Sequence, residues 1–195
     1  MSAEPVPAAP AGWSGPDLRR QRLANHTVED VLALPPDAPR VELRDGVMIV
    51  VPSPTFGHQR ISTLLWSWLR QHAPRNLEPS IAMGVLVGPG QTFEPDVLLL
   101  VAETVHLNSH YATADQVVLV VEVVSPGTRR RDRLEKPAGY AAAGIRHYWR
   151  IEQDPLHVHA YELRGDRYEL VADSTEELVL AKPFEIRLRV RDLAA

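Results

Sequence analysis

Two short apolar runs, each associated with one carboxylate, dominate the hydrophobic pattern of this chain. Residues 117–124 read VVLVVEVV, in which Glu122 is the one polar member. Residues 94–101 read EPDVLLLV, in which Asp96 directly precedes the apolar stretch. Both runs have the length of strands and are bounded by turn-forming residues, which predicts buried β-strands. The pattern therefore places Glu122 within one buried strand and Asp96 at the entrance of another.

The N-terminal half alternates predicted helices with a hairpin. Apolar residues at three- and four-residue steps predict a helix within residues 54–72. A shorter helix is predicted within residues 17–34, with Thr27 as its N-cap. Residues 41–51 predict a hairpin that turns at residues 45–46, an Asp-Gly pair.

The rest of the chain is predicted to be mostly extended. Residues 80–88 predict one strand, residues 88–95 a loop and residues 103–114 an irregular stretch. A helix is predicted from about Leu134, and Gly144 can end it. Further strand-like runs follow at residues 146–152, 157–163, 167–172 and 184–190. Strands that are apolar on both faces predict a mixed α/β fold with a covered sheet and extra antiparallel strands at one edge.

Composition sets the class of protein. The chain has 195 residues, of which 45% are hydrophobic and 24% charged, as in globular proteins. We expect one domain over residues 17–195, after a flexible Pro-, Ala- and Gly-rich tail at residues 1–16. The absence of cysteine excludes disulfides, thiolate zinc sites and cysteine nucleophiles. No apolar stretch approaches the ~20 residues of a membrane span and no signal-peptide pattern occurs, so we expect a cytoplasmic protein with no membrane partner.

The two carboxylates in apolar surroundings need an explanation, because a buried charge is costly unless a positive group meets it. A metal ion held between neighbouring strands is one such group, and carboxylate oxygens suit Mg²⁺ or Mn²⁺. The alternatives are an ion pair between Glu122 and an arginine of the following loop, and a turn-capping role for Asp96. The shared anomaly of both acids favours the metal.

Other residues are candidates on weaker grounds. Glu42 begins the predicted hairpin, where a strand glutamate is typically exposed. Asp132, Lys136 and Tyr140 follow at four-residue steps and share a face if the segment is helical. Lys136 would then lie near a helix start, which is unfavourable for a cation unless an anion is close. His58 begins the long helix, where it either caps the helix or serves a site.

Charge and motifs narrow the chemistry further. Arg129 and Arg130 belong to a basic loop that could contact phosphates, although such loops are usually solvated. The net charge of −4 argues against a strongly basic nucleic-acid binder but is compatible with a nuclease. No GxSxG, GxxxxGK[ST], GxGxxG or HExxH motif is present. His157 and His159 lie on one face of a predicted strand, but the sequence offers no evident third metal ligand.

The order of the motifs resembles the PD-(D/E)XK nuclease superfamily. EPDVLLL followed by VVLVVEVVSPGT carries this resemblance. The wider set VELRDG, SPTFGH, EPDVLLL, VEVVSPGTRRRDRLEKPAGYAAAGI and HYWRIE is similar to the Uma-type family of bacterial endonucleases, over about residues 28–170. The resemblance implies a restriction-endonuclease-like mixed β-sheet core flanked by helices.

The resemblance also implies a set of site residues. Asp96 and Glu122 become metal ligands together with the backbone carbonyl of Val123, and Glu42 becomes an additional catalytic acid. The superfamily places a lysine two residues after this glutamate, but Val124 stands there.

In the Uma-type arrangement the lysine is displaced to the next helix, where Lys136 matches it. Asp132 and Tyr140 match other recurrent positions and are expected to support the site or contact substrate.

These expectations favour a Mg²⁺- or Mn²⁺-dependent nuclease that hydrolyses phosphodiester bonds in DNA as a homodimer. One alternative is an inactive nucleic-acid-binding or assembly module that keeps the nuclease fold, which Val124 favours. Another is a structural dimer whose buried acids pair with Arg130 or Arg146.

Overall fold

A mixed six-stranded sheet forms the centre of the computed structural model, which describes residues 25–35, 37–125 and 131–194. In spatial order its strands are β11 (Arg167–Ser174), β10 (Leu156–Arg164), β9 (His147–Gln153), β8 (Val117–Val124), β6 (Val97–Val101) and β3 (Leu77–Ile81). Neighbouring strands are antiparallel except β8 and β9, which run parallel. β8 has strands on both sides and cores on both faces, so its apolar run is continuous.

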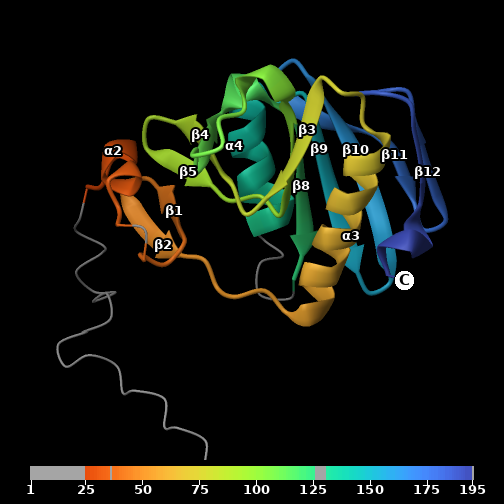
Figure 1. The fold of residues 1–195 in the computed structure, drawn as a ribbon, viewed down its shortest axis with the longest axis horizontal. Helices are drawn as coiled ribbons and strands as arrows, with labels where there is room; N and C mark the ends of the chain where they lie inside the picture. The colour runs from red at the N-terminus through yellow and green to blue at the C-terminus, as the bar shows by residue number, and fades with distance from the viewer. Residues whose placement is uncertain (1–24, 36, 126–130, 195) are drawn as a thin grey trace, which may run out of the picture.

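Helix α3 (Phe56–His72) covers one face of this sheet (Figure 1). Its residues Ile61, Leu65 and Leu69 are buried in the same core as Leu99 of β6 and Val121 of β8. The three helical residues recur at four-residue steps, so one apolar stripe meets the sheet.

Helix α4 (Lys136–Ala142) covers the opposite face. Tyr140 and the following Ile145 are buried there with Leu98, Val120 and Tyr148. Successive residues of β6 and β8 therefore fill two cores, because side chains alternate across a strand. Glu122 is on the α4 side, two residues after Val120.

A five-stranded sheet adjoins the first and carries Glu42. Its order is β2 (Val47–Val50), β1 (Val41–Arg44), β5 (Gln91–Phe93), β4 (Gly84–Gly88) and β7 (Tyr111–Thr113). β5 belongs to this sheet and β6 to the central one, so residues 94–96 connect the two sheets. This connection places Glu94 and Asp96 at the junction.

Two smaller groups of elements lie toward the two ends of the molecule. Helix α2 (Val28–Leu32) accompanies β1 and β2 at one end, and β12 (Glu177–Leu180) pairs with β13 (Ile186–Arg189) near the other (Figure 1). Short helical turns are η1 (Ala102–Thr104), η2 (Ala114–Gln116), the π-helical η3 (Arg131–Glu135) and η4 (Val190–Leu193). Within the three described ranges, each helix is too short or too polar to traverse a bilayer.

The structure confirms the mixed α/β fold and most of the predicted elements. Thr27 caps α2, the hairpin turns at Asp45 and Gly46, and the later strands form as expected. The prediction of a single strand at residues 80–88 is wrong. The extended backbone is interrupted at Ala82, whose φ is 54°. β3 and β4 consequently enter different sheets.

Three further short strands depart from the prediction. β5 lies in the predicted loop at residues 88–95, β7 in the irregular stretch at 103–114, and β12 was not predicted. The predicted tail at residues 1–16, and the basic residues Arg129 and Arg130, lie outside the residues that the structure describes.

Candidate active site

Glu122 is buried in the α4-facing core, and both of its carboxylate oxygens accept hydrogen bonds. Its side chain is 2% exposed, and both carboxylate oxygens accept hydrogen bonds from Lys136 Nζ at 2.9 Å. The Tyr140 hydroxyl donates to Glu122 Oε1 at 2.6 Å. Burial raises the pKa of Glu122 well above the usual glutamate value, although Lys136 opposes the shift, and Asp96 adds to it.

Lys136 reaches this carboxylate from the first turn of α4. Its ammonium also lies 3.1 Å from Glu42 Oε1 and donates to the Glu94 carbonyl at 3.3 Å. Burial opposes the charged form, but Glu122 and Glu42 outweigh it and raise the pKa of Lys136. The lysine is therefore a buried cation surrounded by acceptors, which resolves the unfavourable position that the sequence indicated at a helix start.

The helical turn before α4 brings the predicted face together. Asp132 lies in η3, which leads directly into α4, and its side chain is buried with those of Lys136 and Tyr140. The Tyr148 hydroxyl donates to the Asp132 carbonyl at 2.5 Å and fixes this turn against β9. Because Asp132, Lys136 and Tyr140 are spaced four residues apart, their side chains form one buried polar stripe.

Helix α4 packs closely against strand β5, and this contact fixes the position of α4 relative to the site. A Cβ at Gly139 would lie 2.5 Å from Cε2 of Phe93, the last residue of β5. Tyr140 packs edge-on against the same ring, with ring centroids 5.3 Å apart. Only a residue without a side chain lets α4 lie this close, and Lys136 is one turn away from that contact.

Asp96 is held beside Glu122 by the backbone of β8. Its N–H donates to the Val121 carbonyl at 3.0 Å, and its Oδ2 accepts the Val123 N–H at 2.7 Å. These bonds extend the antiparallel pairing of β6 and β8, in which Val97 faces Val121. Asp96 is thereby fixed at the mouth of the site, with 22% of its side chain exposed.

His58 lies on the other side of Asp96, in the first turn of α3. Its Nε2 is 3.1 Å from Asp96 Oδ2, and its own N–H donates to the Thr55 hydroxyl that caps the helix. Burial lowers the pKa of His58, but the Asp96 carboxylate and the Val123 backbone outweigh it and raise the pKa overall. The histidine therefore contacts the predicted metal ligands as well as beginning the helix.

Glu42 and Glu94 complete the acidic cluster. Glu42 is fully buried, and its Oε1 accepts the Glu94 N–H at 3.2 Å. The Glu94 carboxylate pairs with Arg40, and burial, opposed by Arg40, raises the pKa of Glu94. Neither Glu94 nor Arg40 was predicted from the sequence as a site residue. The one signal for Glu94 was its position directly before the Pro95–Asp96 pair.

These side chains surround a cavity of about 300 Å³. Its described lining includes Arg40, His58, Glu94, Asp96, Glu122, Val123, Asp132 and Lys136, and Glu42 contacts its lysine. Five of these described residues are carboxylates, whereas only Lys136 and Arg40 are permanent cations. A divalent cation fits this excess of carboxylates over cations and the all-oxygen donors that Asp96 and Glu122 offer.

The arrangement bears on the alternatives that the sequence left open. Arg146, one of the proposed structural partners of the acids, is exposed, whereas Glu122 bonds to Lys136 and Tyr140. Val124, where the superfamily has its lysine, is buried, and its carbonyl accepts the Gln153 side-chain N–H at 2.7 Å. The structure therefore brings Glu42, Asp96, Glu122 and Lys136 together.

A mixed sheet is covered by helices on both faces, and an acid cluster lies where it meets the second sheet. This arrangement is expected of a restriction-endonuclease-like protein. The chain matches the family model of Uma2, described as "Putative restriction endonuclease", over residues 28–191. This chain belongs to the Uma2 family. The family confirms the resemblance found in the sequence and supports a nuclease activity.

A solved structure shares the fold. It is described as a "putative nuclease belonging to DUF820" from Anabaena variabilis ATCC 29413. The likeness has a TM-score of 0.69 and covers 86% of this chain and 97% of the other, at 20% sequence identity. No curated protein matches the chain in sequence.

Proposed function

We propose that this protein is a metal-dependent nuclease that hydrolyses phosphodiester bonds in DNA. The observation that carries the proposal is the excess of buried carboxylates around Lys136, in a cavity open enough for Asp96 to meet solvent. Such an imbalance is costly in a folded protein unless a cation compensates it. Membership of the Uma2 family supports the reaction class.

Asp96 and Glu122 are the residues proposed to hold the ion, with the Val123 carbonyl as a further oxygen donor. Mg²⁺ or Mn²⁺ bound there would polarise a phosphoryl oxygen and lower the pKa of a bound water. His58 and the Val123 N–H keep the Asp96 carboxylate in place from two directions. Tyr140 does the same for Glu122 through its donated hydrogen bond.

Lys136 is proposed as the catalytic cation. An ammonium with three donors can orient an attacking water and stabilise negative charge that develops on the phosphoryl group. Glu42 and the Glu94 carbonyl also hold Lys136 Nζ in position. A metal ion on Glu122 would share that carboxylate with the Lys136 ammonium.

A second cavity next to the acid cluster supports a nucleic-acid substrate. It has a volume of about 260 Å³, and Arg133, the chain neighbour of Asp132, is part of its lining. Its lining includes Arg133, Arg150, Arg167, Tyr148, Tyr161 and Tyr168. The Arg150 guanidinium lies 5.6 Å from the centroid of the Tyr161 ring. Arginines can contact phosphates, and the partly exposed Tyr161 and Tyr168 rings can stack on bases, which suits a nucleic-acid strand that extends from the scissile bond. A homodimer is part of the proposal, because two copies of the site would address the two strands of a duplex.

One observation favours an inactive nucleic-acid-binding module instead. Lys136 already bonds to both oxygens of Glu122, and the usual lysine position is occupied by Val124. In that case the ion pair would stabilise the fold and the site would bind without turnover.

Calorimetric titration with Mg²⁺ and with Mn²⁺ tests the metal site. Wild-type protein should give binding heat that Asp96→Asn abolishes, and a wild type that gives no heat with either ion would contradict the proposal. Incubation of plasmid, single-stranded DNA and RNA with Mn²⁺ then separates the two candidate functions. Cleavage supports the nuclease and identifies its substrate, whereas metal-dependent DNA binding without cleavage supports the inactive module.

A further inference from the structure

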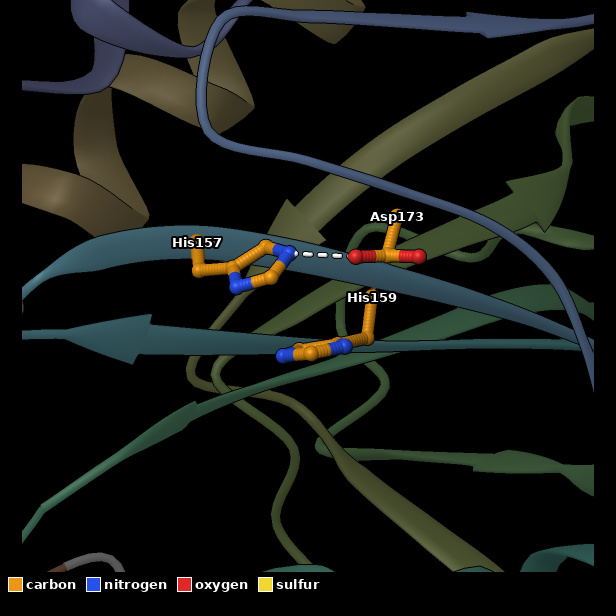
Figure 2. Close-up of side chains that lie close together, drawn as sticks. All are labelled: His157, His159 and Asp173. Atoms are coloured by element: carbon orange, nitrogen blue, oxygen red, sulfur yellow. Dashed lines mark hydrogen bonds and ion pairs between the residues drawn. The ribbon is translucent and has the colours of Figure 1, made fainter.

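Two histidines and an aspartate meet on the outer strands of the central sheet, away from the acid cluster. His157 and His159 are two residues apart on β10, so both side chains project from one face. Asp173 of β11 lies directly opposite His159 in the strand register. The third ligand that the sequence did not reveal is thus supplied by the neighbouring strand. Figure 2 shows the His157 ring facing Asp173, with the His159 ring beside them.

The geometry of this cluster is that of a preformed ligand set. His157 Nε2 lies 2.6 Å from Asp173 Oδ2, and the two imidazole rings stack with centroids 4.1 Å apart. One ligand atom from each residue lies within 4.8 Å of the others. Zinc ligands bind at about 2.0–2.2 Å, so ligand atoms of one site lie within about 4 Å of each other. Small rotations of these partly exposed side chains close the difference.

We propose that His157, His159 and Asp173 form a second metal site, which takes Zn²⁺ or a similar transition-metal ion. Two imidazoles and one carboxylate favour such ions, whereas the all-carboxylate site at Asp96 and Glu122 favours Mg²⁺ or Mn²⁺. The side chains are open to solvent, so water can complete the coordination. The bound ion would join β10 to β11.

The surroundings set the charge of the site. On the neighbouring strand β9, Arg150 lies opposite His159 and Glu152 lies opposite His157. Arg150 is paired with Glu152 at 3.1 Å. This pairing weakens the repulsion between the Arg150 charge and a bound metal ion.

The second site is separate from the proposed catalytic site but lies on the same face of the sheet. Glu122 faces Arg150, and Arg150 faces His159, in successive strand registers. Two strand spacings separate Glu122 from His159, or about 10 Å. A metal ion at one site would therefore not contact the ligands of the other.

Calorimetry with Zn²⁺ alone on the full, untagged chain tests the proposal. The variants are His159→Gln and Asp173→Asn, and the matched control is His110→Gln, which removes an exposed histidine from another part of the surface. The wild type and the control should bind Zn²⁺ alike, and each ligand variant should bind at least about tenfold more weakly. Asp96→Asn should leave this Zn²⁺ binding intact, which separates the second site from the proposed nuclease site.

Two results would overturn the second site. One is a wild type that gives no Zn²⁺ heat. The other is equal Zn²⁺ binding by wild type, His159→Gln and Asp173→Asn, which would leave His157 and Asp173 as a surface ion pair only. Circular dichroism of each variant verifies that the fold is retained, and the exposure of these side chains makes this the expected result.

Discussion

Lys136 Nζ lies 2.9 Å from each carboxylate oxygen of Glu122, although 14 residues separate the two in the chain. A lysine at position 124 would project from the same face of β8 as Glu122, because side chains alternate along a strand. Helix α4 covers that face and delivers Lys136 to it from above. The ammonium therefore reaches the carboxylate by a different route, which accounts for Val124 at the usual lysine position.

Replacement of Lys136 by Met should destabilise the metal-free protein by about 3–5 kcal/mol, because it leaves Glu122 and Glu42 buried without their cation. Mg²⁺ should stabilise this variant more than it stabilises the wild type, since the variant has a larger excess of negative charge. Urea denaturation with and without Mg²⁺ measures both effects. DNA cleavage should be lost.

The matched control for that variant is Arg70→Met, which removes an ion pair between two exposed side chains on α3 and β3. An exposed pair contributes at most about 1 kcal/mol, so the control should unfold almost as the wild type does. A Lys136→Met protein as stable as this control would show that the buried acids do not depend on the lysine.

Substitution of Gly139 by Ala should lower both stability and activity. The new Cβ would meet the buried Phe93 ring at 2.5 Å, so α4 or the ring must move. Overpacking of this kind costs about 1–3 kcal/mol, which exceeds the gain of up to about 1 kcal/mol in helix propensity. Thermal unfolding measures the loss. Gly88→Ala is the control, because nothing lies within 4 Å of the added Cβ, and it should not be destabilising.

Local sequence signals predicted several of the helices and strands. The apolar stripe of α3, the Thr27 cap and the continuous apolar run of β8 are each encoded by neighbouring residues, and each forms as expected. Helical spacing also placed Asp132, Lys136 and Tyr140 on one face.

The features that the sequence did not predict depend on tertiary contacts. β5 and β7 have three residues each and are strands only because neighbouring strands pair with them. The pairing of Glu94 with Arg40 joins the connection after β5 to the segment before β1, which no local pattern reveals. Asp173 likewise joins His157 and His159 only through the register of β10 with β11.

Acid should destabilise the protein partly through His147, which is buried on β9. Burial lowers its pKa; Glu162 opposes the shift, whereas Lys182 and Arg146 add to it. The native imidazole stays neutral where the unfolded histidine, with a pKa of about 6.5, takes up a proton. The stabilisation is therefore present above about pH 6.5 and is lost as the pH falls below it.

The variant His147→Gln removes this titration. Between about pH 7.5 and 5.5 the wild type should lose more unfolding free energy than the variant does, by no more than about 1.4 kcal/mol per pH unit. Denaturant titrations across this range give the difference. Parallel curves for the two proteins would show that His147 is protonated equally in the native and unfolded states.

The most direct test of the account is cleavage of DNA by wild type and Asp96→Asn in the presence of Mn²⁺. Asparagine can still accept the Val123 N–H, so the variant should keep its fold, which circular dichroism verifies. The control is Asp115→Asn, which changes an exposed aspartate in η2. Wild type and control should cleave equally, and Asp96→Asn should be slower by at least about a hundredfold, because metal catalysis contributes several kcal/mol. Undiminished cleavage by Asp96→Asn would contradict the account.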